Sequence, residues 1–478
     1  MIKSKIAFII GSIFLGGWAF AQDNKTIRYQ VNSETSLDTL SNQEVIEEGN
    51  HIHYADRLDN FFEQLYLLDS LKQGKVNIVH VGDSHIQADF LTGKIRKLMQ
   101  SRFGNGGLGF VFPYRLAKTN GNSAVRYTSN VDWDSRRNIY PVNGANVGLS
   151  GISLSTENKN LVIEMKIRDN EYSFSRMKVF TPTEEQLFNL GRTDKQLSLD
   201  SGVSKKVHHT IRSGESLSSI ARKYGTTITE LKKTNRLRNN TIHAGKRLSV
   251  PTKAKEPVFV NPSVFEEVEA VKAEGYYDFS FNKEQNKIYF YPKEDVDLYD
   301  LNGIVLENSE AGLIYHAIGV NGAKFSDYTK YPLFFEQLKG LEPDLLVLSM
   351  GTNEAFDRMS VEEFQEKVNA FLLELKRKLP NVNVLITTPP PSYFSKGEPN
   401  TLATEFSNEM LINGMNSDYA VWDLYYNLGG NLGLEQLREE SLLGRDLVHY
   451  TVKGYEYSAD LFFDAIIAAY QRYLEKKK

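Results

Sequence analysis

Three polar residues of this chain could together perform nucleophilic catalysis: Ser84, Asp446 and His449. A serine hydroxyl is a weak nucleophile, so it needs a base that removes its proton and a third group that orients the base. His449 is a suitable base, and Asp446 precedes it by three residues, a spacing that lets the carboxylate reach Nδ1 while Nε2 faces the serine. These residue types predict acyl-transfer chemistry with Ser84 as the nucleophile.

Each of these residues also has an ordinary structural explanation. Serine is favoured at helix N-caps, so Ser84 could simply cap the helix that follows it. An isolated histidine such as His449 is more often structural than catalytic. Independent caps and turns have no reason to reproduce a complete triad, however, and the combination therefore favours catalysis.

Other catalytic motifs find little support. The sequence contains no Gly-x-Ser-x-Gly elbow, no His-Glu-x-x-His pair and no phosphate-binding loop ending in Gly-Lys-Ser/Thr. The Ser-x-x-Lys string from Ser175 to Lys178 lies in a predicted strand without its companion motifs, and we interpret it as chance. His208 and His209 lack ligand partners at suitable spacing, so we expect no metal site and no cofactor.

The elements that must position Ser84 are a strand and a helix. Val76–Val81 has the continuous apolar pattern of a buried parallel strand, and a predicted helix over Ile86–Arg102 follows the serine. A helix predicted over Asp56–Leu71 precedes this strand. The same alternation returns much later, with predicted strands at Leu313–Ile318, Leu345–Ser349, Val382–Thr387 and Tyr419–Asp423 and helices at Val361–Leu379 and Val452–Tyr473. This order predicts an α/β fold, a parallel sheet with helices on both faces and polar motifs at the carboxyl ends of its strands.

The region between these two parts has a different pattern. Short β-rich runs over residues 122–176 and 275–307 are separated by Asn, Gly, Ser and Asp turns. We interpret this region as a β-sandwich inserted into the α/β domain. A third unit, His208–Pro251, lies within the insertion between segments that are typical of linkers.

Four blocks of the sequence resemble, in order, the signature blocks of the SGNH or GDSL hydrolases. They are Gly82-Asp83-Ser84-His85, Gly319-Val320-Asn321-Gly322, Gly351-Thr352-Asn353-Glu354 and Asp446-Leu447-Val448-His449. The resemblance implies a three-layer αβα, flavodoxin-like fold over residues 50–120 and 311–476. It also implies an oxyanion hole made by the N–H groups of Ser84 and Gly322 and the side-chain amide of Asn353.

Two details of these blocks leave alternatives open. Glu354 stands where the family often has Asp, which leaves its local role undefined. Asn353 alone would more often be a turn residue that tolerates left-handed geometry. The segment Pro389-Pro390-Pro391, with Tyr393 and Phe394, is expected either to wall a substrate cleft or to form a rigid structural loop.

The third unit, residues 207–253, is similar to LysM domains, which are βααβ modules that bind peptidoglycan and chitin. The similarity rests on His209–Ala221, on Tyr224-Gly225-Thr226-Thr227 and on Leu231, Asn235, Leu237, Ala244-Gly245, Leu248 and Val250-Pro251. It implies glycan contacts at two segments, made of Gly214, Glu215, Ser216 and Leu217, and of Asn240, Thr241, Ile242, His243 and Ala244. A LysM that has lost binding and serves as a spacer is the alternative.

The first residues predict export. Lys3 and Lys5 precede the short apolar run Ile6–Leu15, and small residues at Ala19-Phe20-Ala21 lead to Gln22, which is typical of a signal peptide over residues 1–21. The run is shorter than the roughly 20 residues of a membrane span, so we expect no membrane anchor after its removal. The expected location is the periplasm or the extracellular space.

Composition excludes some classes of function. The chain contains no cysteine, which rules out disulfides, cysteine metal sites and a thiol nucleophile. Its net charge is −4, and −6 without the two signal lysines, which gives no global basis for binding nucleic acid.

Further predictions follow from resemblance. Residues 121–206 and 254–310 form the expected sandwich, similar to a carbohydrate-binding module, and an SGNH domain interrupted in this way resembles bacterial peptidoglycan O-acetylesterases. The resemblance implies a secreted esterase that removes O-acetyl groups from peptidoglycan or a related N-acetylated glycan. The alternatives are a deacetylase of another polysaccharide such as xylan, an O-acetyltransferase and a noncatalytic peptidoglycan-binding protein.

Overall fold

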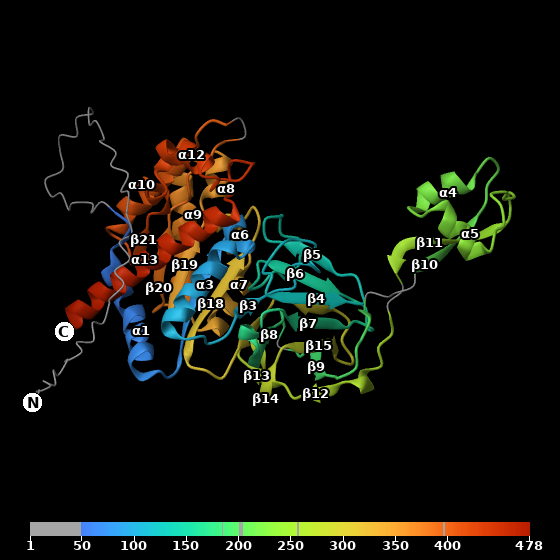
Figure 1. Cartoon of the computed structure of the whole chain (residues 1–478), viewed down its shortest axis with the longest axis horizontal. Helices are drawn as coiled ribbons and strands as arrows, with labels where there is room; N and C mark the ends of the chain where they lie inside the picture. The colour runs from blue at the N-terminus through green and yellow to red at the C-terminus, as the bar shows by residue number, and fades with distance from the viewer. Residues whose placement is uncertain (1–48, 184, 200–203, 256–257, 395–396) are drawn as a thin grey trace, which may run out of the picture. The chain divides into compact units, whose positions relative to one another are not determined.

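The computed structural model describes residues 49–183, 185–199, 204–255, 258–394 and 397–478 (Figure 1). The expected export signal at residues 1–21 lies outside these ranges. Within them, no helix is both long and apolar enough to cross a membrane.

A six-stranded sheet forms the centre of the α/β domain. Its strand order is β1-β21-β20-β19-β2-β18, and all neighbours are parallel except β1 and β21. Without the edge strand β1, the order in chain sequence is 2-1-3-4-5, as in flavodoxin-like folds. The strands are β1 (Ile52–His53), β2 (Lys75–Gly82), β18 (Gly312–Gly319), β19 (Leu345–Ser349), β20 (Asn383–Thr387) and β21 (Tyr419–Trp422).

Helices cover both faces of this sheet. On one face α1 (Asp59–Leu71), α3 (Phe90–Phe103) and α13 (Val452–Lys477) share a buried apolar cluster with the strands. The other face carries α6 (Phe325–Thr329), α7 (Pro332–Leu338), α9 (Val361–Lys378) and α10 (Thr401–Gly414), which contact one another around α9. The α9 helix buries Phe364, Val368, Phe371 and Leu375, a helical spacing that places all four side chains on one face. The three-layer α/β architecture predicted from the sequence is therefore present.

The helix predicted over Ile86–Arg102 is interrupted. It consists of α2 (Ser84–Gln87) and α3, and between them Asp89 adopts a left-handed conformation with φ of 60°. The Asp89 carboxylate binds the guanidinium of Arg96 through two hydrogen bonds of 2.9 Å, and the Arg96 side chain is only 2% exposed. The chain turns at Asp89 because this carboxylate neutralises a charge buried under the sheet.

Apart from the nested unit, the described residues of the insertion between β2 and β18 form three antiparallel sheets, one more than the predicted sandwich. Their strand orders are β12-β9-β15-β7-β4, β13-β14-β8-β17-β3 and β16-β6-β5. We expected the insertion to begin at residue 121. It begins earlier, because the three residues of β3 pair with β17 of the insertion. The strands are β3 (Gly109–Val111), β4 (Val125–Ser129), β5 (Asp134–Arg137), β6 (Ile152–Thr156), β7 (Ile163–Ile167), β8 (Phe174–Phe180), β9 (Phe188–Arg192), β12 (Glu266–Val268), β13 (Val271–Ala273), β14 (Tyr276–Gln285), β15 (Lys287–Pro292), β16 (Tyr299–Leu301) and β17 (Gly303–Glu307).

The unit nested in the insertion has the βααβ order predicted for a LysM domain. Two antiparallel strands, β10 (Ser204–Thr210) and β11 (Arg247–Lys255), enclose the helices α4 (Leu217–Tyr224) and α5 (Ile228–Asn235). Both helices begin with capping boxes. The unit has a small apolar core of its own, formed by Ile211, Leu217, Ile220, Ala221, Leu231, Leu248 and Val250.

The buried Asp89–Arg96 pair gives a test of the fold. We expect Asp89→Asn, which keeps the shape of the side chain and tolerates the left-handed backbone, to lower the free energy of unfolding by about 3 kcal/mol, because it leaves the Arg96 charge uncompensated. Urea denaturation of the α/β domain measures the change. Asp297→Asn, at an exposed ion pair with Lys159, is the matched control and should leave the transition unchanged.

Candidate active site

The polar blocks meet where three neighbouring strands end. Gly319 at the end of β18 and Ser349 at the end of β19 both pair with Gly82, the last residue of β2. The loops that follow these strands therefore begin at the same edge of the sheet, the edge where ligands bind in folds of this type.

Ser84, His449 and Asp446 form a continuous hydrogen-bonded chain. The Ser84 Oγ lies 2.7 Å from His449 Nε2, and His449 Nδ1 lies 2.7 Å from Asp446 Oδ2. The histidine and aspartate side chains are 43% and 56% exposed, so the chain opens to solvent. The three residues are brought together in the order that general-base activation of a serine requires.

The segment carrying Asp446 and His449 is a tight irregular turn directly before α13. Asp446 Oδ1 accepts hydrogen bonds from the backbone N–H groups of Val448 (3.1 Å) and His449 (2.9 Å). Leu447 takes a left-handed conformation with φ of 62° to allow this turn. Although partial burial raises the pKa of Asp446, hydrogen bonds from the His449 side chain and from these N–H groups outweigh it and lower the pKa below 3.8. The carboxylate is thus ionised and fixed beside the imidazole.

The alternative that Ser84 merely caps a helix is wrong. Asp83 is the N-cap of α2, and its carboxylate accepts the N–H of His85 at 2.9 Å. Ser84 is the first helical residue, where the backbone N–H has no intrahelical acceptor and the helix dipole is positive. Burial raises the pKa of Asp83 to about 7, an effect only partly offset by its hydrogen bond from His85 and by His449.

Gly322 and Asn353 lie in the loops that follow β18 and β19. Gly322 has φ of 85° in a turn closed by a hydrogen bond from Ala323 N–H to Val320 O, a conformation that favours glycine. Asn353 belongs to the helix α8 (Thr352–Phe356) and is not the left-handed turn residue considered from sequence, a position that Gly351 takes with φ of 116°. Its amide donates to Ala323 O at 3.0 Å and to an Asp83 carboxylate oxygen at 3.3 Å, which ties the second and third blocks to the first.

Glu354 has a definite role. Its side chain is fully buried and accepts hydrogen bonds from the backbone N–H of Phe325 (2.9 Å) and of Gly351 (3.1 Å). Burial raises the pKa of Glu354 to about 8, with these hydrogen bonds acting in the opposite direction. The glutamate thus joins the loops that carry Gly322 and Asn353.

The sequence predicted no role for two residues close to Ser84, His85 and Gln87. The buried ring of His85 lies 5.3 Å from that of His449, its Nδ1 is 3.0 Å from Tyr455 Oη, and burial lowers its pKa to about 3. Gln87 accepts the Asn321 N–H at 2.6 Å and donates to Asn120 O at 2.6 Å. Both lie within three residues of Ser84, so proximity to the nucleophile was the available signal.

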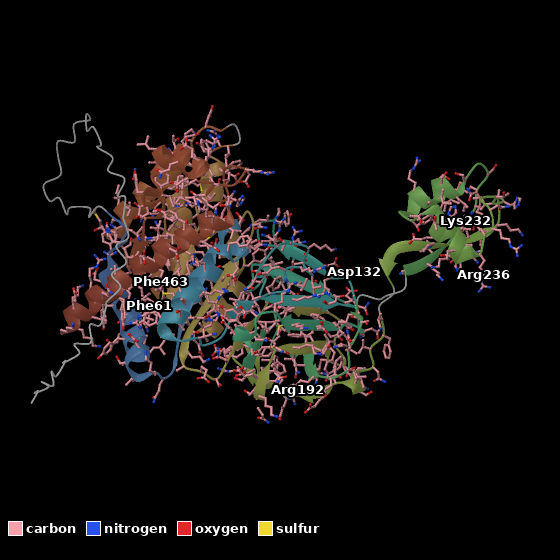
Figure 2. The ribbon with its side chains drawn as sticks, viewed as in Figure 1. Phe61, Asp132, Arg192, Lys232, Arg236 and Phe463 are labelled. Carbon is pink, nitrogen blue, oxygen red and sulfur yellow. The ribbon has the colours of Figure 1, made fainter. Side chains whose placement is uncertain are left out.

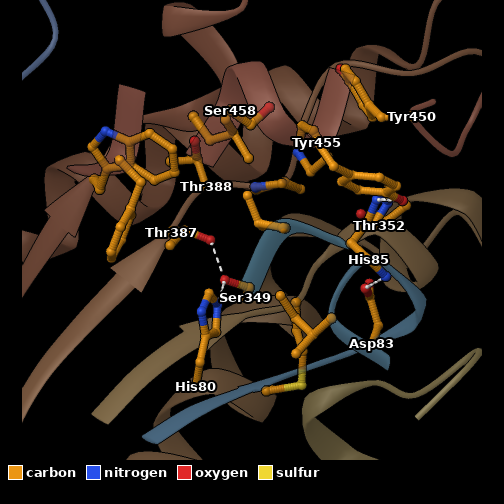
Figure 3. A pocket seen from close by; sticks show the side chains of 18 of the residues that line it. His80, Asp83, His85, Ser349, Thr352, Thr387, Thr388, Tyr450, Tyr455 and Ser458 are labelled. Atoms are coloured by element: carbon orange, nitrogen blue, oxygen red, sulfur yellow. Dashed lines mark hydrogen bonds between the residues drawn. The ribbon is translucent and has the colours of Figure 1, made fainter. Parts of the chain in front are cut away.

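A small cavity lies between the ends of β2, β19 and β20 and the helix α13, and Asp83 and His85 contribute to its wall (Figure 3). The enclosed space that a water molecule can occupy is about 20 Å³, enough for about one water. Polar groups in its wall are bonded to one another, with Ser349 Oγ lying 2.5 Å from His80 Nε2 and 2.7 Å from Thr387 Oγ1 (Figure 3). It is too small for a substrate, and the described residues contain no group of three His, Cys, Asp or Glu side chains that could hold a metal.

The proline-rich segment holds the turn that carries Asp446 and His449. Tyr393 N–H donates to Leu447 O at 2.9 Å, and Tyr450 Oη donates to Pro391 O at 2.8 Å. Pro389 also packs near Gly351, where an added Cβ would lie 3.2 Å from its ring. These contacts favour the rigid structural loop among the two alternatives.

The expected glycan-contact residues of the LysM unit lie on two adjacent segments. Ile211 donates to Lys246 O and accepts from Gly245 N–H, at 2.9 and 2.8 Å, which places the segments side by side. Leu217 is buried in the unit's core, whereas Glu215 bonds internally to His209 Nε2 and to Arg212 N–H, both at 2.7 Å. The exposed members of the set are Gly214, Ser216, Asn240, Thr241, His243 and Ala244, and Ile242 is half-buried.

Comparison with known families agrees with this geometry. Residues 305–457 match the GDSL-like lipase/acylhydrolase family, a range that includes Gly322, Asn353, Asp446 and His449 but begins after Ser84. Residues 305–457 thus carry a GDSL-like lipase/acylhydrolase domain. Residues 209–251 match the LysM domain family.

Solved structures and one curated relative extend the comparison. The chain matches a structure of a peptidoglycan O-acetylesterase with 18% identity over 86% of this chain and 96% of the other, at a TM-score of 0.59, a likeness of fold. A lipase/acylhydrolase from Enterococcus faecalis matches with 25% identity over 32% of this chain and 76% of the other, at a TM-score of 0.27. A LysM domain-containing protein of Mus musculus is 37% identical over 60 residues, which are 12% of this chain and 28% of that protein. The match thus spans little more than a quarter of the length of the mouse protein.

The raised pKa of Glu354 gives a prediction for stability against pH. Between about pH 4.5 and pH 8 the unfolded state has lost this proton while the folded state keeps it, so stability falls as pH rises, by up to about 1.4 kcal/mol per pH unit. We expect Glu354→Gln to reduce this slope in urea denaturation at several pH values. Part of the slope should remain in this variant, because burial also raises the pKa of Asp83, to about 7.

The control for this measurement is Glu366→Gln, at an exposed glutamate of α9. It should leave the slope as in the wild type. An identical slope in Glu354→Gln and in the wild type would contradict the assignment of this proton to Glu354.

Proposed function

We propose that this esterase removes O-acetyl groups from peptidoglycan, using Ser84, His449 and Asp446 as its catalytic residues. The observation that carries the proposal is the unbroken hydrogen-bonded chain through these residues, with 2.7 Å at each step. The LysM domain and the fold likeness to a peptidoglycan O-acetylesterase support the choice of cell-wall glycan as substrate.

In the first half-reaction Ser84 Oγ attacks the carbonyl carbon of the acetyl ester and its proton moves to His449 Nε2. Asp446 keeps the imidazole oriented and stabilises the imidazolium that forms. The negative charge that develops on the carbonyl oxygen is stabilised by the N–H groups of Ser84 and Gly322 and by the Asn353 amide. His449 then protonates the sugar oxygen as the C–O bond breaks, which leaves an acetylated Ser84.

In the second half-reaction water replaces the sugar. His449 removes a proton from the water, which attacks the acetyl group on Ser84, and the proton then returns to Ser84 Oγ as acetate leaves. The exposure of the His449 side chain supports this step, because water reaches the imidazole without a conformational change.

The LysM domain would act in this proposal by holding the enzyme on its polymer. A glycan strand bound by LysM presents its acetyl esters at a raised effective concentration, without any change in the active site. Export to the periplasm or the extracellular space would bring the enzyme to this substrate.

The test is release of acetate from O-acetylated peptidoglycan, measured beside hydrolysis of 4-nitrophenyl acetate. We expect the wild-type protein to act on both, and Ser84→Ala to lose at least about 10³-fold in kcat on both, because the acyl-enzyme route is closed. Ser175→Ala, in the Ser-x-x-Lys string of β8, is the matched control and should keep wild-type activity.

Different failures identify different errors. Activity on acetylated xylan without activity on peptidoglycan would show that peptidoglycan is not the substrate. Transfer of the acetyl group to a sugar acceptor in place of free acetate would indicate a transferase. Wild-type rates in Ser84→Ala would overturn the catalytic assignment.

A further inference from the structure

The LysM domain carries a strong positive charge that the net charge of the chain conceals. Residues 209–251 contain nine Lys and Arg and only two acidic residues, a formal charge of +7 in a chain of net charge −4. Eight of the nine basic residues are exposed, and Figure 2 shows Lys232 and Arg236 at the α5 side of the domain.

The two acidic residues do not neutralise this charge. Glu215 bonds to His209 and to the Arg212 backbone, and Glu230 accepts the N–H of Thr227 at the start of α5. In the part of the chain that the structure describes, no ion pair within 4 Å involves any Lys or Arg of residues 209–251.

Ordinary structural effects explain only part of the pattern. Arg222, Lys223, Lys232 and Lys233 occupy the last turns of α4 and α5, where cations stabilise the helix dipole. Of the other five, Arg236 is the C-cap of α5 and Arg247 lies in β11, whereas the remaining three stand next to the predicted glycan-contact segments. Arg212 precedes the first predicted glycan-contact segment, and Arg238 and Lys246 stand on either side of the second.

We propose that Arg212, Arg238 and Lys246 bind carboxylate groups of the glycan that occupies the segments between them. This inference rests on the proposed function, because it takes the ligand to be peptidoglycan, whose peptides carry carboxylates next to N-acetylated sugars. Guanidinium and ammonium groups form charge-assisted hydrogen bonds with carboxylates, and the surrounding positive charge attracts an anionic polymer from a distance. The domain thereby distinguishes peptidoglycan from chitin, which is neutral.

The test compares binding of the full-length protein to purified peptidoglycan sacculi and to chitin oligomers. Changing Arg212, Arg238 and Lys246 together to Gln should weaken binding to sacculi about tenfold and leave binding to chitin oligomers unchanged. Raising NaCl from about 50 mM to about 500 mM should weaken the sacculus interaction of the wild type, since salt screens exposed charges.

The matched control removes the same charge elsewhere, by changing Lys223, Lys232 and Lys233 to Gln, and it should reduce binding less. Equal losses in the two triple variants, or salt-independent binding, would overturn the proposal. Duplex DNA that competes with sacculi for the wild type at lower concentration would overturn it in favour of nucleic acid. Hydrolysis of 4-nitrophenyl acetate reports separately on the esterase.

A second observation concerns the peptide group between Asn321 and Gly322. Arg137, the last residue of β5 in the insertion, donates from Nη1 to the Asn321 carbonyl at 3.4 Å. The N–H of Gly322 belongs to the same planar peptide group, and in a trans peptide the C=O and N–H point in opposite directions. Arg137 therefore lies on the side opposite to the proposed oxyanion donor.

This arrangement is held from several directions. The second Arg137 nitrogen, Nη2, lies 3.0 Å from Tyr140 Oη, and Asn321 N–H donates to Gln87 at 2.6 Å. A Cβ placed on Gly322 would lie 3.7 Å from the Ile139 side chain. The insertion thus contacts the loop of the second block directly.

We infer that Arg137 is a positioning residue of the esterase, which holds the 321–322 peptide with its N–H directed at the oxyanion. Its positive charge at the carbonyl also polarises the peptide and makes the Gly322 N–H a stronger donor. The benefit is largest when the substrate oxygen becomes negative, so Arg137 acts on kcat in preference to KM.

Kinetics on 4-nitrophenyl acetate test this inference, which rests on wild-type activity. Arg137→Gln should lower kcat about tenfold with KM unchanged, Arg137→Lys should recover part of the loss, and added guanidinium should partly restore Arg137→Ala. The neighbouring Arg136→Gln is the control, because Arg136 donates to Pro141 O within its own loop and should leave kcat unchanged. A raised KM at constant kcat, or no change in Arg137→Gln, would overturn the inference, whereas an inactive wild type would contradict the proposed function.

Discussion

The close approach of three strand ends at Gly82 and Gly319 is the constraint on which the site depends. A Cβ on Gly82 would lie 2.6 Å from Ser349 O, and one on Gly319 would lie 2.3 Å from Gln87 N. A larger residue at Gly82 would push β2 away from β19, and one at Gly319 would push β18 away from α2 and the loop that carries Ser84. Gly82 and Gly319 are therefore required by backbone packing, while the chemistry belongs to the residues that follow them.

A network of polar contacts between loops then fixes the geometry at this edge. Asp83, Asn353 and Glu354 each connect two of the loops through hydrogen bonds. Two of these groups are carboxyls in nearly dry surroundings, with pKa values raised to about 7 for Asp83 and about 8 for Glu354. Removing a carboxyl group from water costs free energy, so these two groups lower the stability of the folded protein. In return, their hydrogen bonds keep the loops of the site rigid.

The sequence predicted the strands and helices of the α/β domain well because their signals are local, and it placed Ser84, Asp446 and His449 close together, as they are in the structure. Apolar runs such as Leu345–Ser349 identify buried parallel strands, and parallel strand ends must share one edge of the sheet. It predicted the insertion less well. Its antiparallel strands are short and their partners distant, so nothing local shows that Gly109–Val111 pairs with Gly303–Glu307. The break at Asp89 was missed for a similar reason, since it depends on the buried position of Arg96.

The long separation between Ser84 and His449 has a consequence for the order in which the enzyme becomes competent. The two residues lie 365 positions apart, and the insertion with its LysM domain is made between them. Contacts between distant parts of a chain form late, because the entropy of closing the loop must be met first. The LysM domain has an apolar core of its own and can fold earlier. Ser84 consequently has no His449 beside it until that last segment and α13 have been synthesised and docked. Under the proposed function, the growing chain would gain its glycan binding before its ester hydrolysis.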